Sequence, residues 1–344
     1  MKLATPRWWY VRGLSQRQGG MPVTRALLTP LSWIWAGVTA RRIARARAFD
    51  PGVPVICVGN LTLGGTGKTP VVRAVAERLA AQGSAKGGKA VHLLSRGYGG
   101  SLQGPIRVDP ARHTAGEVGD EPLMLAADFP VWIARDRAAG AKAAVQAGAE
   151  VIVMDDGHQN PSVTKTLSIV VVDGETRDDA WPFGDGRVFP AGPLREPLKV
   201  GLARADAVVI LLPAHLAEPD AELVQTLDGR PLSVAHLRPD APPPGGPQVG
   251  FAGIGMPWKV ERALRAAGCE LADFAPFPDH HAYDEATLRR LAQRAAQFGA
   301  GLVTTEKDWV RLPPAWRAGV VAWPVSAVFD DPAALDALLT KAGL

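Results

Sequence analysis

Short apolar runs alternate with stretches whose apolar residues recur at helical spacing, from Val53 to about position 212. Runs of this length are typical of buried strands, and alternation with helices indicates a parallel sheet covered on both faces. The pattern therefore predicts an α/β fold. The expected strands are 53–58, 90–94, 131–134, 151–154, 168–172 and 207–212, and a helix is expected over 136–147.

The pattern changes from about Gly229, where prolines and glycines become frequent and reach their highest density at 242–247. Such composition is typical of a linker. Beyond it, the pattern predicts strands at 249–254 and 301–305 and helices at 257–267 and 284–298. We therefore expect three parts: an N-terminal segment over 1–48, a central core over 49–228, and a linker with a smaller C-terminal α/β domain over 229–344.

The N-terminal segment carries basic residues and, up to Phe49, neither Asp nor Glu. The uncharged stretch 26–40 is shorter than the ~20 residues that a spanning helix needs. Flanking arginines and interfacial aromatic residues favour helices lying in the face of an anionic leaflet, although a basic helix packed on the core is the alternative. The aromatic residues are Trp8, Trp9, Tyr10, Trp33 and Trp35.

The 344 residues have a formal net charge of +4, and the excess is concentrated at the N-terminal end. This distribution indicates a membrane surface rather than nucleic acid, so no nucleic acid partner is expected. No obligate protein partner is evident either. The two cysteines, Cys57 and Cys269, suggest a reducing compartment without a disulfide framework.

A phosphate-binding loop directly follows the first predicted strand. Its backbone N–H groups can turn toward a polyphosphate, Lys68 can reach the outer phosphates, and the Thr69 hydroxyl can coordinate Mg²⁺ at a helix start. Thr62 stands where the generic motif has glycine, and a glycine-rich turn without a ligand is the alternative. With this loop the expected fold is a P-loop NTPase-like parallel sheet. The loop comprises Thr62, Leu63, Gly64, Gly65, Thr66, Gly67, Lys68 and Thr69.

Two carboxylates, Asp155 and Asp156, end the predicted strand 151–154. In P-loop enzymes an acid at the carboxyl end of a strand beside the loop holds Mg²⁺. One Asp can hold the metal or its water while the other holds Lys68, and the sequence leaves open which does which. The alternative is a strand followed by a simple Asp-Asp-Gly turn.

Two loop segments, 118–122 and 277–283, supply candidate acid–base groups. A kinase that acts on a hydroxyl benefits from a carboxylate such as Asp120 and from an imidazole that orients or shares the proton. His280 and His281 could also bind a metal, but no third ligand stands at a suitable spacing. Structural histidines are the alternative.

The order of the motifs resembles that of the tetraacyldisaccharide 4'-kinase family, the lipid A kinases of Gram-negative envelope synthesis. Thr62 matches that family's own pattern, whereas His158 and Asn160 stand where the family often has other residues. The resemblance covers nearly the whole chain. It rests on the segments 58–62, 68–70, 94–99, 119–122, 134–137, 155–159, 190–196, 279–281 and 305–308.

This resemblance implies a P-loop kinase core that transfers the γ-phosphoryl group of ATP to the 4'-hydroxyl of tetraacyldisaccharide 1-phosphate, with Mg²⁺, at the cytoplasmic face of the inner membrane. It implies Lys68 as a catalytic phosphate-holding residue and Asp120 as the proton acceptor. It also implies His280 as the partner of Asp120, coming from the second domain as the two units close, and the sequence leaves open whether His281 takes this place instead. Candidate phosphate contacts, with structural ion pairs as the alternative, are Arg96, Arg135, Arg137 and Arg195.

A GTPase and a nucleotide-binding regulator are the alternatives to a kinase. A GTPase would need an Asn-Lys-x-Asp guanine-binding motif, which the chain lacks. A membrane-attached P-loop nucleotide-binding regulator would keep the loop and the N-terminal segment but would need neither Asp120 nor His280. This alternative stays open at the level of the sequence.

Overall fold

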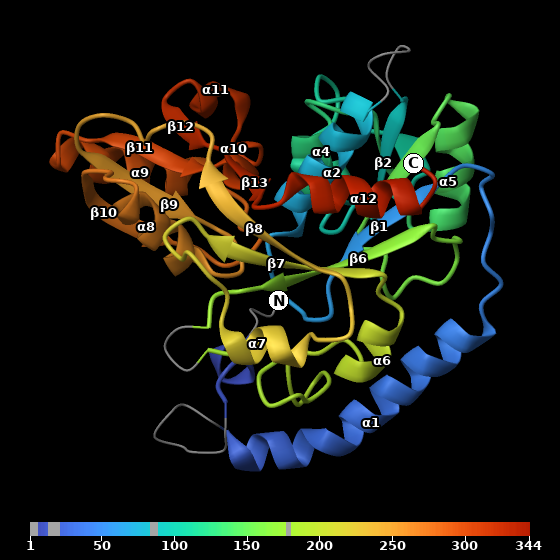
Figure 1. Ribbon diagram of the computed structural model, residues 1–344. Coiled ribbons are helices and arrows are strands. Elements are labelled where there is room, and N and C mark those ends of the chain that lie inside the picture. Colours follow the sequence, from blue (N-terminus) through green and yellow to red (C-terminus); the bar gives the residue numbers. More distant parts are fainter. Residues whose placement is uncertain (1–5, 13–20, 83–88, 177–179) are drawn as a thin grey trace.

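The computed structural model describes residues 6–12, 21–82, 89–176 and 180–344. In this part of the chain, a large sheet has the strand order β13-β8-β7-β6-β1-β5-β2-β4-β3 (Figure 1). Its pairs are parallel except at the edges, where β3 and β13 run antiparallel to their neighbours. The strands are β1 (Val55–Gly59), β2 (Val91–Ser95), β3 (Ile106–Arg107), β4 (Val131–Ile133), β5 (Val151–Asp155), β6 (Leu167–Asp173), β7 (Ala207–Pro213), β8 (Leu232–Pro239) and β13 (Val325–Phe329).

Helices cover both faces of the large sheet, because alternate strand residues point to opposite sides. Ile56 and Val153 pack with α2, α4 and α12 on one face. Val55, Ile152 and Val170 point to the other face, toward α5, α6 and α7. The predicted α/β fold class is confirmed. The helices are α2 (Lys68–Gln82), α3 (Ala115–Val118), α4 (Asp120–Leu125), α5 (Arg137–Gln146), α6 (Leu198–Ala203), α7 (Ala221–Thr226) and α12 (Pro332–Lys341).

A second, smaller sheet has the order β10-β9-β11-β12, with all pairs parallel. It lies beside the large sheet at the opposite end from α5 (Figure 1). Its strands are β9 (Gln248–Ala252), β10 (Leu271–Pro276), β11 (Gly301–Thr305) and β12 (Val320–Trp323), and its helices are α8 (Pro257–Ala266), α9 (Glu285–Gln297), α10 (Glu306–Trp309) and α11 (Pro314–Arg317).

The chain passes from the large sheet to the smaller one and then returns. The stretch 232–239, expected to belong to a linker, forms β8 and pairs with β7. After the smaller sheet, β13 pairs with β8 and α12 packs on the core of the large sheet. The proline-rich connection is therefore shorter than the sequence suggested, and the domain boundaries at 48/49 and 228/229 stay a prediction.

The N-terminal helix α1 (Pro22–Arg45) buries polar side chains and exposes apolar ones, the reverse of an ordinary surface helix. Its buried side chains are Arg25, Ser32 and Thr39, which face the body of the protein. Ser32 donates to the Val188 carbonyl at 2.7 Å. No helix among the described residues is both long and apolar enough to cross a membrane. The side chains that α1 exposes include Val23, Leu27, Leu31, Trp33, Ile34 and Val38.

Candidate active site

The phosphate-binding loop lies between β1 and α2, at the carboxyl end of a central strand of the large sheet. Gly64 and Gly67 have φ values of 99° and 73°, which favour glycine. A Cβ on Gly67 would lie 2.4 Å from Leu211 Cδ2, so the leucine side chain would have to move, and the positive φ itself disfavours other residues. Lys68 opens α2, where N–H groups without helical partners favour phosphate.

Asp155 ends β5 and Asp156 directly follows it. β5 pairs directly with β1 in the register Val58 to Asp155. Burial alone would raise the pKa of Asp156, but Arg195 and Lys68 hold it well below its usual range. Arg195 Nη1 lies 2.7 Å from Asp156 Oδ1, and Lys68 Nζ lies 3.8 Å from the same atom. Asp156 is therefore fixed by two cations.

Asp155 has a different environment. Burial raises the pKa of its carboxyl to about 6, although Lys68 and Arg137 oppose this shift. Its Oδ1 is buried and has no hydrogen-bond partner among the described residues. An unpaired buried carboxylate oxygen is costly unless a ligand satisfies it. Thr69 lines the same cavity, and oxygen donors such as these are the ligands that a hard cation such as Mg²⁺ prefers.

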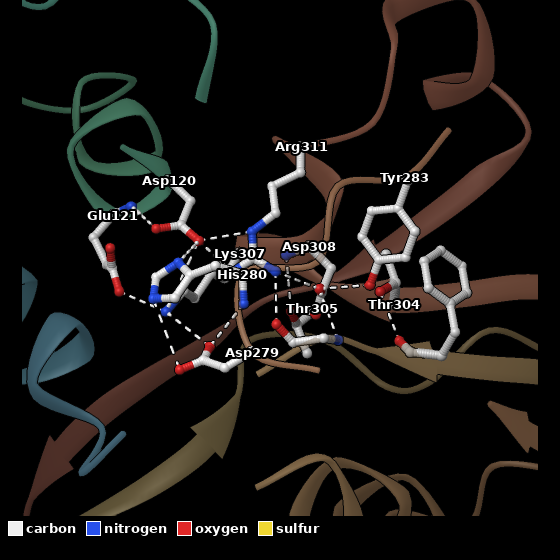
Figure 2. A network of polar contacts seen from close by, with 12 residues as sticks. Asp120, Glu121, Asp279, His280, Tyr283, Thr304, Thr305, Lys307, Asp308 and Arg311 are labelled. Atoms are coloured by element: carbon white, nitrogen blue, oxygen red, sulfur yellow. Dashed lines mark hydrogen bonds and ion pairs between the residues drawn. The ribbon is translucent and has the colours of Figure 1, made fainter. Parts of the chain in front are cut away.

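Asp120 and His280 lie together although they are far apart in sequence (Figure 2). Asp120 is the first residue of α4, and His280 follows β10 in the smaller unit with a φ of 55°. His280 Nδ1 lies 2.8 Å from Asp120 Oδ2. His281 instead stacks on Phe277, with ring centroids 4.6 Å apart. The structure thus places His280, not His281, beside the carboxylate.

Two cations from the smaller unit complete this cluster, and no role was predicted for either from the sequence. Arg311 Nε donates to Asp120 at 2.6 Å, and its Nη1 donates to the Gly253 carbonyl at 2.7 Å. Lys307 Nζ donates to Glu121 Oε1 at 2.5 Å. Lys307 lies in the segment 305–308, which is part of the family resemblance, whereas Arg311 lies in no recognised motif.

The neighbouring cations lower the pKa of Asp120, whereas burial controls the pKa of Glu121. Burial would raise the pKa of Asp120, but the Glu121 side chain, His280, Lys307 and Arg311 together hold it far below its usual range. For Glu121, burial dominates and raises the pKa to about 7 in spite of Lys307. Asp120 is therefore a fixed anion, and both of its oxygens accept hydrogen bonds.

A cavity of about 1550 Å³ connects these groups. Its lining includes Lys68 and Asp155 from the large-sheet unit and His280 from the smaller unit. It extends to Trp8 and Trp35 of the N-terminal segment. The four arginines predicted to contact phosphate also line the cavity: Arg96, Arg135, Arg137 and Arg195.

A parallel sheet whose phosphate-binding loop, adjacent Asp pair and the imidazole of an Asp–His pair line one cavity is typical of the class of P-loop phosphotransferases. Comparison with known proteins gives the particular family. The family model described as tetraacyldisaccharide-1-P 4'-kinase matches residues 24–343. The chain belongs to this family, and the predicted resemblance is confirmed.

Similar proteins support the assignment over the full length. The tetraacyldisaccharide 4'-kinase of Phenylobacterium zucineum is 72% identical over 98% of this chain and 99% of its own. That of Caulobacter vibrioides is 67% identical over the whole of both chains. A crystal structure of LpxK from Aquifex aeolicus in complex with ATP has a TM-score of 0.71 and 26% identity, covering 93% of this chain and 99% of that one.

Family membership confirms the predicted activity class. The chain is an ATP-dependent phosphotransferase with an alcohol group as acceptor, in lipid A biosynthesis. The individual roles expected for Lys68, Asp120, His280 and the Asp pair stay predictions.

Proposed function

We propose that this kinase transfers the γ-phosphoryl group of ATP to the 4'-hydroxyl of an acylated glucosamine disaccharide 1-phosphate held at a membrane surface. One observation carries the proposal: a single cavity joins the phosphate-binding loop, the His280 imidazole and the aromatic residues of the N-terminal segment. Phosphate donor, proton acceptor and lipid-linked alcohol can therefore meet in one space.

The nucleotide is held by the loop 62–69. Its N–H groups and the positive end of α2 receive the β- and γ-phosphates, and Lys68 neutralises the charge that develops during transfer. The resting contact of Lys68 with Asp156, at 3.8 Å, keeps the ammonium near this position. The ATP complex of the Aquifex aeolicus relative supports the assignment of the nucleotide.

The residues of this chain that fit Mg²⁺ are Thr69 and Asp155. The unpartnered Oδ1 of Asp155 favours it over Asp156, whose carboxylate is already paired with Arg195 and Lys68. Held by Thr69 and Asp155, Mg²⁺ would supply positive charge that offsets the negative charge of the phosphates. Asp156 then keeps Lys68 and Arg195 directed at the phosphates.

The acceptor proton goes to the Asp120–His280 pair. Asp120 is the predicted acceptor, but its side chain is only 3% exposed, whereas His280 is 14% exposed and lines the cavity. We therefore propose that the imidazole takes the proton from the hydroxyl and that the fixed carboxylate stabilises the resulting imidazolium. Because the pair spans the two units, their closure around the nucleotide would complete the site.

We expect α1, with its exposed apolar side chains, to hold the site at the lipid surface. Its exposed apolar side chains would enter the interface, and Arg41, Arg42, Arg45 and Arg47 near its end would attract anionic headgroups. An acylated substrate stays in the bilayer, so the cavity must come to the headgroup plane. The cytoplasmic face of the inner membrane, where ATP is available, is the proposed location.

The test is a transfer assay with purified protein, ATP, Mg²⁺ and the lipid disaccharide in detergent micelles. We expect phosphate on the disaccharide in the wild-type reaction. An Asp120→Ala protein should lose transfer by orders of magnitude and keep nucleotide binding. Nucleotide binding or hydrolysis without any transfer in the wild-type protein would instead favour a membrane-attached nucleotide-binding regulator.

A further inference from the structure

We propose that Tyr10 and Trp35, from the N-terminal segment, are positioning residues that set the conformation of the phosphate-binding loop. This inference rests on the nucleotide role proposed above for residues 62–69. Neither side chain is part of the loop or of the catalytic cluster. Each donates one hydrogen bond to a backbone carbonyl that shapes the start of the loop.

Tyr10 acts on the loop itself. Its hydroxyl donates to the carbonyl oxygen of Leu63. The Leu63 carbonyl and the Gly64 N–H belong to one trans peptide, so they point in opposite directions. Holding the carbonyl on Tyr10 therefore aims the Gly64 N–H away from Tyr10. Since Gly64 adopts a positive φ and has no side chain to restrain it, this external contact limits its freedom.

Trp35 acts on the loop indirectly, through Arg195, whose segment pairs with the loop. Its indole N–H donates to the Arg195 carbonyl at 3.1 Å. Arg195 in turn donates its backbone N–H to the Leu61 carbonyl at 2.8 Å and its Nε to the Thr62 carbonyl at 2.9 Å. The same guanidinium holds Asp156. Trp35 thereby fixes a residue that touches both the loop and the Asp pair.

Together these contacts engage three successive carbonyls at the start of the loop: those of Leu61, Thr62 and Leu63. A carbonyl oxygen that turned toward a phosphate would repel it, so holding all three by donors favours the phosphate-binding conformation in advance. The donor on Leu63 is Tyr10, which directly follows the short 3-10 helix η1 (Arg7–Trp9), and the donor on Arg195 is Trp35 of α1. The segment that we assign to the lipid surface thus also shapes the nucleotide site.

The experiment measures binding of a non-hydrolysable ATP analogue with Mg²⁺ to the full-length protein in detergent, without acceptor. Tyr10→Phe and Trp35→Phe each remove one donor and keep an aromatic ring. Trp33→Phe is the matched control, because Trp33 lies on the same helix, is 72% exposed and makes no hydrogen bond to the loop. Thermal unfolding midpoints of all variants are measured in parallel.

We expect the dissociation constant to rise about three- to tenfold in Tyr10→Phe and in Trp35→Phe, the size of one lost hydrogen bond. The control should stay at the wild-type value. In steady-state transfer, Tyr10→Phe should raise KM for ATP and leave KM for the lipid acceptor unchanged, a division that general destabilisation would not produce.

Unchanged nucleotide affinity in both variants, or an equal loss in Trp33→Phe, would overturn the proposal. A wild-type protein that binds no nucleotide would instead refute the proposed function of the loop. The two failures are therefore distinguishable. If one variant is unfolded, the other still decides, because Tyr10 and Trp35 lie in different elements of the segment.

Discussion

The most specific prediction concerns the contribution to stability of Arg311, the cation that links the smaller unit to the buried carboxylate Asp120. Its guanidinium is only 6% exposed. It donates to Asp120, to the Gly253 carbonyl and, at 2.9 Å, to Asp308 Oδ1. Arg311→Ala removes all of these donors at once and leaves two buried carboxylates with fewer partners.

The expected cost follows from the partners that remain. Removing one member of a buried ion pair costs about 3–5 kcal/mol, because the other charge stays buried. Asp120 keeps His280 and the Glu121 amide, and Asp308 keeps Tyr283 at 2.7 Å. We therefore expect the lower end, about 3 kcal/mol, which a protein of ordinary stability survives.

Urea unfolding at neutral pH measures this loss, and Arg289→Ala is the matched control. Arg289 lies in the smaller unit, its side chain is 70% exposed, and its ion pair is confined to α9, so its removal should leave the free energy of unfolding unchanged. A loss in Arg311→Ala no larger than in the control would show that Asp120 does not depend on Arg311, and would refute the reasoning.

Three further outcomes are expected. Lys68→Ala lowers kcat about 10²–10³-fold in the transfer assay, and activity near wild type would contradict its role. Burial raises the pKa of Glu121 to about 7, above its value in the unfolded chain, so its stabilising contribution is present at low pH and lost as pH rises through about 7. Glu121→Gln should flatten the stability curve between about pH 5 and 8, and an unchanged slope would count against the assignment. Replacing Leu31 and Ile34 by Glu should abolish binding to anionic vesicles in a flotation assay; retained binding would exclude α1 as the anchor.

The sequence predicted the parts of the fold whose pattern is strong and local. β1, β5 and β6 are short, mostly apolar runs, and the glycine-rich loop after β1 has a spacing that fixes its position. The Asp pair followed because the carboxyl ends of neighbouring parallel strands share one edge of the sheet. These predictions need no knowledge of distant contacts.

Contacts between distant segments were harder to predict. β8 was expected to be linker because prolines flank it, yet pairing with β7 and β13 overrides that local signal. Arg311 stands in no motif, and its role appears only when the smaller unit meets α4. The partner of Asp120 was expected as His280 from family resemblance alone, and the physical reason, the 2.8 Å contact, is a property of the folded chain.

The return of the chain through β13 has a mechanical consequence. The smaller sheet is attached by two strands that run side by side, with Pro239 opposite Val325 in the register. A unit joined by two adjacent strands can rotate about the line between them but resists twisting. His280 would therefore move toward and away from Asp120 along a single path. Deleting the last twenty residues or so would not trim an appendage: it would remove a strand and a helix from the large sheet and cut one of the two connections.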